Sequence, residues 1–203
     1  GYTSLRKRRA ATAAPVRDPA EKSVTMTQTE PAVVLAMDTS TDTLACAVAR
    51  MTPLPTGGSS VELLASGDHA CRRKADVDRV LVGRGPGSFT GVRIGIATAK
   101  GIACGIARPL LGASTLDAVA WNAWSAGVRG RLGVVGDAMR GEVYPGVYVL
   151  DDAGAHRTFA NEVVSKADDC VADWAARSDA AELTLAGDGL RKYRQRFEAA
   201  GFS

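Results

Sequence analysis

The stretch that decides the fold is GRGPGSFTG, residues 83–91. It lies between an apolar run, residues 77–82, that is typical of a strand, and a stretch that is typical of a helix. Glycine-rich loops in this position often hold phosphate. This loop lacks the Lys-Ser or Lys-Thr pair of a Walker loop, the last glycine of GxGxxG and the GxSxG pattern of a nucleophile elbow. It therefore fits none of the standard glycine-loop chemistries.

The helix expected over residues 91–106 carries small residues at every fourth position: Gly91, Gly95, Ala99 and Ala103. Positions four apart share one helix face, and small side chains let another element approach closely. Each glycine in a helix costs about 1 kcal/mol relative to alanine, so close packing must offset this cost. The strip packs either on the protein's own sheet or on another subunit, and we expect the subunit contact.

The rest of the chain predicts an α/β protein in two similar halves. Three antiparallel strands come first, and alternating helices and parallel strands follow. A second strand-rich segment begins near residue 131, and we expect its half to be incomplete. Pro145 predicts an edge or bulged strand over 141–150. The other strands are expected at 32–38, 43–50, 61–69, 77–82, 108–114, 131–138 and 183–189. Further helices are expected at 114–124 and 190–200, and Ser114 and Asp117 have capping-box spacing at the start of the first of these two.

Charge and composition limit the function classes. The chain has 203 residues and a formal net charge of +3, but residues 1–25 hold six basic and two acidic residues. We expect this segment to be a disordered tail; a basic tail that touches RNA is the alternative. The remainder holds 19 basic and 20 acidic residues, and lacks the broad basic surface of a protein that binds nucleic acid unaided.

We expect neither a metal site nor a membrane-spanning segment. The four cysteines form no CxxC pair, and the only two histidines, His69 and His156, lie far apart in the chain. A structural zinc site needs ligands in close pairs. No apolar run is long enough to span a membrane, and we expect a cytoplasmic protein with reduced cysteines.

Several segments together resemble the TsaB (YeaZ) family in sequence and in order. They are LAMDTSTDTLACAVA (35–49), VGRGPGSFTGVRIGIATAKGIA (82–103), STLDAVA (114–120), DAMRGEVY (137–144) and LAGDGL (185–190). The resemblance implies an actin/Hsp70-like ATPase (ASKHA) fold of two ribonuclease-H-like lobes. We expect the tail at 1–25, the N-terminal lobe at 26–130 and a partial C-terminal lobe at 131–203.

The same resemblance implies a non-catalytic scaffold or dimerisation subunit. Its catalytic TsaD-type paralogue transfers a threonylcarbamoyl group to N6 of adenosine 37 in tRNAs that read ANN codons. The paralogue holds a metal with an HxxxH pair, which this sequence lacks. The implied partners are that paralogue and a TsaE-type ATPase, with a homodimer when the chain is alone and tRNA contacted only through the complex.

Site residues follow from the resemblance as expectations, with no catalytic or metal-binding residue among them. The expected subunit interface comprises Gly91, Arg93, Ile94, Gly95, Thr98, Ala99 and Ile102. The loop that sets the helix entry comprises Gly85, Pro86, Gly87, Ser88 and Thr90, with Ser88 or Thr90 as the cap. A weak nucleotide motif comprises Asp38, Ser40 and Thr41, and ATP or ADP could bind at the interface with the paralogue.

The sequence departs from the family's pattern in one segment, and two rival functions stay open. The family's helix between the third strand and the glycine loop is replaced by about six residues after His69. One rival function is a nucleotide-binding regulator. Another is a glycoprotease-like hydrolase or acyltransferase that uses Ser88, for which only His69 or His156 could act as the base.

Overall fold

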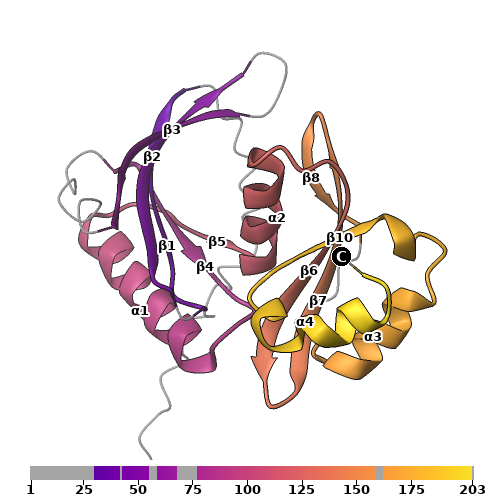
Figure 1. The fold of residues 1–203 in the computed structure, drawn as a ribbon. Coiled ribbons are helices and arrows are strands. Elements are labelled where there is room, and N and C mark those ends of the chain that lie inside the picture. Colours follow the sequence, from indigo (N-terminus) through magenta and orange to yellow (C-terminus); the bar gives the residue numbers. More distant parts are fainter. Residues whose placement is uncertain (1–29, 42, 55–58, 68–76, 159–161, 203) are drawn as a thin grey trace, which may run out of the picture.

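The computed structural model describes residues 30–41, 43–54, 59–67, 77–158 and 162–202. Two β-sheets with helices on their faces make up this part of the chain (Figure 1). The expected tail at 1–25 and the short segment after His69 lie outside the described residues. The domain boundary at 130/131 stays a prediction, although the second sheet does begin with the strand at Gly130. None of the described helices is long and apolar enough to cross a membrane.

The first sheet has the strand order β3-β2-β1-β4-β5. β1, β2 and β3 pair in antiparallel fashion, whereas β1, β4 and β5 run parallel. This arrangement confirms the expected meander followed by parallel strands. The bounds are β1 Ala32–Asp38, β2 Ala45–Pro53, β3 Ser59–Ser66, β4 Arg79–Gly83 and β5 Leu110–Ala113.

The second sheet has the order β10-β6-β7-β8, and β9 also pairs with β7. The prediction that Pro145 marks an edge or bulged strand is wrong. β7 pairs with β6 on one side and with β8 and β9 on the other, and Pro145 lies between the segments that contact β8 and β9. A central strand thus tolerates a proline where the second ladder is interrupted. The bounds are β6 Gly130–Met139, β7 Glu142–Asp151, β8 Gly154–Arg157, β9 Ser165–Lys166 and β10 Leu183–Ala186.

The core consists of three clusters of buried side chains, which lie between the helices and the two sheets. α1 (Phe89–Gly105) packs on the outer face of the first sheet, and α2 (Thr115–Ser125) lies between the two sheets (Figure 1). α3 (Ala167–Ala175) and α4 (Leu190–Ala199) cover the other face of the second sheet, with a short 3-10 helix, η4 (Ala180–Glu182), before β10. Because α2 contacts the inner face of the second sheet, it joins the two halves.

The small-residue strip of α1 faces the protein's own chain, so the expectation that it contacts another subunit is wrong. Gly95, Ala99 and Ala103 are buried, and Ala99 is completely inaccessible within the core of the first sheet. A Cβ atom at Gly95 would overlap the side-chain oxygen of Thr39, and one at Gly91 would overlap the carbonyl oxygen of the same residue. The strip is small because the turn after β1 and the strands lie directly against it.

Candidate functional site

The glycine loop interlocks with the turn that follows β1. A Cβ atom at Gly87 would overlap the carbonyl oxygen of Ser40 and lie 2.8 Å from its Cβ atom. Real Cβ atoms do not approach backbone this closely, so the position requires glycine. The Thr39 hydroxyl donates a 2.6 Å hydrogen bond to the carbonyl oxygen of Gly91 and fixes the turn on the other side. The glycines therefore admit the chain's own turn where a phosphate loop would admit a ligand.

Several polar groups of this loop and turn bond within the chain. The Ser88 amide donates to the Ser40 carbonyl at 2.6 Å, and the Ser40 amide donates to Asp38 Oδ1 at 2.8 Å. Ser88 is the N-cap of α1, and its hydroxyl accepts from the Gly91 amide at 3.3 Å. The cap prediction is thus confirmed for Ser88 and not for Thr90. Amides that are used in this way are not free to bind phosphate.

A buried hydroxyl pair ties the turn to α2. The Thr115 hydroxyl donates to Asp38 Oδ2 at 2.8 Å and lies 2.8 Å from the hydroxyl of Ser40, which is only 2% exposed. Asp38 therefore accepts hydrogen bonds on both carboxylate oxygens. Its role toward a nucleotide, and those of Ser40 and Thr41, stay predictions.

A cleft of about 330 Å³ separates this turn from the second sheet. On its far wall, the Asp137 amide donates to Asp188 Oδ1 at 3.0 Å, and the Lys192 ammonium pairs with Asp137 Oδ2. The hydrogen bond to Asp137 raises the pKa of Lys192 above its usual value, so the lysine is charged at neutral pH. The cleft is lined by Ser40, Thr41, Ser88, Asp137, Met139, Asp188, Arg191 and Lys192.

An ion network that the sequence did not predict joins the two halves beside the glycine loop. Glu162 accepts from Arg84 at 2.8 Å and from Arg157 at 3.0 Å. Burial alone raises the pKa of Glu162, but hydrogen bonds with Ser114 and the two arginines outweigh it and lower the pKa below its usual value. Arg157 also donates to Asp117 at 2.6 Å. Arg84 lies 78 positions from Glu162, and Asp117 lies 40 positions from Arg157, so no local sequence pattern joins these partners.

The expected capping box at the start of α2 is wrong. Ser114 is the N-cap residue, but its side chain makes no capping bond. Its hydroxyl accepts from Arg157 at 2.8 Å, and Asp117 accepts from the Tyr148 hydroxyl at 2.9 Å. Both side chains are drawn into the network that joins α2 to the second sheet.

The outer face of α1 contrasts with its buried strip. Phe89 is 68% exposed and Ile94 is 58% exposed, and the Arg93 guanidinium stacks 3.9 Å from the centre of the Phe89 ring. Thr98 is exposed on the same helix, whereas Ile102 packs partly against the first sheet. The expected interface residues therefore split into an inner set, which is packed within the chain, and an outer set: Arg93, Ile94 and Thr98.

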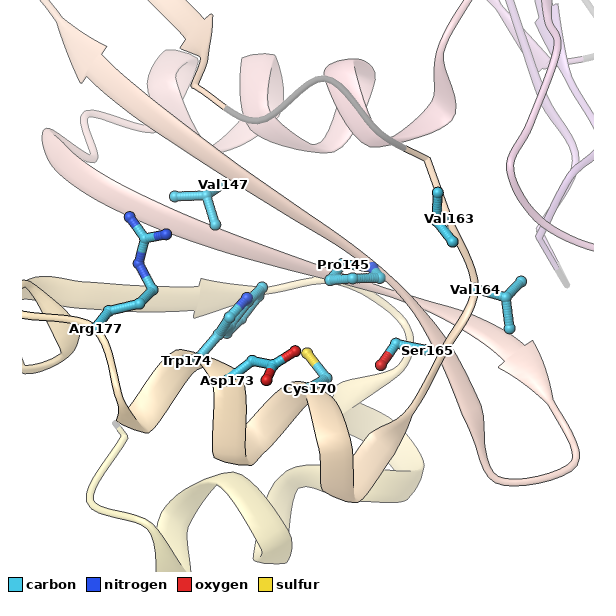
Figure 2. Close-up of a pocket in the computed structure, with 9 residues that line it drawn as sticks. All are labelled: Pro145, Val147, Val163, Val164, Ser165, Cys170, Asp173, Trp174 and Arg177. Carbon is cyan, nitrogen blue, oxygen red and sulfur yellow. The ribbon is translucent and has the colours of Figure 1, made fainter.

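A second hollow, of about 490 Å³, lies between β7, the segment 163–165 and α3 (Figure 2). Its lining is mostly apolar, and Trp174 and Pro145 form part of it. Burial, helped by the charge of Asp173, raises the pKa of the Cys170 thiol to about 12. This thiol is therefore protonated at neutral pH and is a poor nucleophile.

The remaining candidates for catalysis are dispersed. His156 lies on β8, where it pairs with Asp151 at 3.1 Å; His69 lies outside the described residues. Across the described ranges, no three His, Cys, Asp or Glu side chains gather as they would around a metal ion.

Comparison with known proteins agrees with the motifs. Residues 68–196, more than half of the chain, match the family model described as TsaD: tRNA N6-adenosine threonylcarbamoyltransferase. The chain is 44% identical over 91 residues to the tRNA threonylcarbamoyladenosine biosynthesis protein TsaB of Escherichia coli, and 34% identical over 99 residues to that of Bacillus subtilis. The alignments cover 45% and 49% of this chain and only 39% and 40% of those two proteins.

Two solved structures from Pseudomonas aeruginosa have a similar fold. One is described as an uncharacterized protein with similarity to peptidase YEAZ (30% identity, TM-score 0.60) and the other as YeaZ (31% identity, TM-score 0.59). Each alignment covers 81% of this chain and 79% of the other. The α/β fold is therefore the ASKHA fold that the sequence predicted. With these structures and the family model in agreement, the chain belongs to the TsaB (YeaZ) family.

Proposed function

We propose that this chain is a non-catalytic scaffold subunit of a complex that transfers threonylcarbamoyl to N6 of adenosine 37 in tRNAs reading ANN codons. It acts by binding a TsaD-type catalytic paralogue, with a TsaE-type ATPase as a further partner, and it forms a homodimer when alone. The relatives named for threonylcarbamoyladenosine biosynthesis support the pathway. The observation that carries the binding role is the exposed apolar outer face of α1.

The composition of this face suits protein–protein association. Phe89 and Ile94 leave more than half of their surface in water, although α1 is otherwise well packed. Burying apolar area contributes about 25 cal/mol per Å², and aromatic residues and arginine are enriched among the residues that dominate interfaces. Arg93 already lies over the Phe89 ring, which provides a flat, ordered surface for a partner helix.

The geometry of Ser88 argues against a hydrolase. A serine nucleophile needs a base within hydrogen-bond reach, but the Ser88 hydroxyl accepts a bond from the backbone of its own helix. His156 is engaged with Asp151 near the β7–β8 turn. The glycine loop therefore serves to shape α1 and its entry.

For nucleotide, we propose a site shared with the paralogue rather than one built by this chain's own loop. The amides of Ser40, Ser88 and Gly91 already donate within the chain, so these three are not available to a phosphate group. Isothermal titration of the isolated chain with ATP and ADP tests this point. Tight binding by the chain alone would favour the nucleotide-binding regulator.

The association itself is tested with two matched variants. Ile94→Glu places a charge on the outer face of α1, and Val61→Glu places the same charge on β3, where Val61 is 65% exposed. Size-exclusion chromatography with light scattering, with and without the paralogue, measures association, and circular dichroism monitors the fold. We expect Ile94→Glu to abolish association and Val61→Glu to retain it, with both folds intact. Association that survives Ile94→Glu would overturn the assignment of this face.

A further inference from the structure

A cationic hollow of about 620 Å³ lies beside the edge of the second sheet. One wall is formed by residues 185–187 at the end of β10, which pairs with β6 alone among the described strands. The other wall is the first half of α4, which supplies Arg191, Lys192, Arg194 and Gln195. Arg191 and Lys192 also line the cleft between the halves, together with Asp137 and Asp188, so the hollow and that cleft share one wall.

The charges near this hollow are unevenly distributed. α4 carries Arg191, Lys192, Arg194 and Arg196 against a single acid, Glu198. Lys192 pairs with Asp137 and Arg196 with Asp168. The Arg194–Glu198 pair spans 3.5 Å with both side chains more than half exposed. Exposed pairs of this kind contribute about 0–1 kcal/mol, so Arg194 can exchange its carboxylate for a phosphate at little cost.

The chemistry of the hollow suits a phosphodiester backbone. Guanidinium groups bind phosphate oxygens through paired hydrogen bonds, and a strand edge and a glutamine amide add neutral donors. Half or more of the hydrogen bonds between proteins and DNA go to phosphate and sugar, where they position the polymer without reading its sequence. A long, mobile anion that meets several such groups gains from each of them.

We propose that this hollow binds the phosphate backbone of the tRNA substrate, so that the scaffold itself holds the tRNA within the complex. This inference rests on the proposed function, because it takes tRNA as the polyanion that the complex must bind. It goes beyond a subunit that contacts tRNA only through its partner. Because the chain outside residues 1–25 is close to neutral, we expect weak binding by the free chain.

The test measures how the affinity for tRNA depends on salt. The full-length chain carries Arg6→Gln, Lys7→Gln, Arg8→Gln and Arg9→Gln, so that its basic N-terminal residues do not mask the effect. Fluorescence anisotropy with an unmodified tRNA that reads an ANN codon gives the dissociation constant from 20 to 200 mM KCl. Each phosphate contact contributes about 0.7–0.9 to the slope of log K against log salt. The double variant Arg191→Gln with Arg194→Gln loses two such contacts. Between 50 and 200 mM KCl, its affinity should therefore fall by a factor about 7 to 12 times smaller than that of the chain with only the N-terminal substitutions.

The control changes two exposed arginines elsewhere, Arg50→Gln with Arg108→Gln, each of which lies near an acid as Arg194 does. We expect the control to retain the original slope. An unchanged slope in the α4 variant, an equal loss in the control, or no binding at 20 mM KCl would each overturn the proposal. Association of the chain without the α4 substitutions with the paralogue is measured in parallel. Intact association with an unchanged slope refutes this inference alone, whereas failed association with a reduced slope refutes only the scaffold role.

Discussion

Two alanine substitutions in α1 should have opposite effects on stability. Gly91 and Gly101 lie on the same helix, but their surroundings differ. A Cβ atom at Gly91 would overlap the carbonyl oxygen of Thr39 and lie 3.1 Å from its carbonyl carbon, whereas one at Gly101 would meet no atom within 4 Å. The pair therefore separates the intrinsic helix preference for alanine from the contact with the turn after β1.

The magnitudes follow from these contacts. Gly101→Ala should gain up to about 1 kcal/mol of unfolding free energy from helix propensity. Gly91→Ala gains less, because it stands near the helix start, and it must displace a backbone carbonyl. Overpacking of this kind costs about 1–3 kcal/mol, and moving the turn weakens the Ser88–Ser40 hydrogen bond by about 0.5–1.5 kcal/mol. We expect a net loss of about 2 kcal/mol.

Thermal unfolding monitored by circular dichroism measures both variants. For a chain of this size, about 2 kcal/mol corresponds to a decrease in Tm of about 4–8 °C, while Gly101→Ala should raise the Tm by a few degrees. Chemical denaturation in urea provides an independent value of the free energy. If Gly91→Ala is as stable as Gly101→Ala, the small strip does not pack on Thr39, and the intramolecular assignment of this face fails.

Three further predictions concern other contacts. Because Glu162 has a lowered pKa in the folded state, its charge stabilises the fold above about pH 4.5. The stability advantage of the wild type over Glu162→Gln should therefore shrink as the pH falls through the folded pKa. Urea unfolding from pH 7 to pH 3 measures this difference in free energy, and a difference that does not change with pH would contradict the network. At pH 8, iodoacetamide should label the exposed Cys104 far faster than the buried Cys170, as peptide mass spectrometry would report, and equal rates would refute the burial. Gly187→Ala should lose about 2–4 kcal/mol, since Gly187 has a φ of 121° and a Cβ atom there would overlap a β6 carbonyl oxygen; a Tm equal to that of the wild type would contradict this close approach.

Local sequence patterns predicted most of the first sheet. The apolar runs and the glycine loop placed β1, β4 and α1 within a few residues of their observed bounds, because burial of a strand and the entry of a helix leave local signals. The α3 helix was missed, although Ala167, Cys170 and Trp174 are buried at helical spacing. The helix could have been predicted from that spacing.

The misplaced features depend on contacts between distant parts of the chain. A strip of glycine and alanine on α1 predicts a close neighbour, but the pattern is the same whether that neighbour is another subunit or Thr39 of the same chain. Pro145 predicts an interrupted ladder, but not that β8 and β9 continue on either side of it. The Arg157–Glu162–Arg84 network combines residues from both halves, and only the fold brings them together.

The most direct test of the scaffold role is transfer of labelled threonylcarbamoyl to an unmodified ANN-reading tRNA. The assay compares the purified chain alone, the TsaD-type paralogue with the TsaE-type ATPase, and all three proteins together, with the Ile94→Glu variant as a fourth arm. We predict transfer only when all three wild-type proteins are present and a loss of transfer with Ile94→Glu. Transfer by this chain alone, or equal transfer with and without it, would contradict the account.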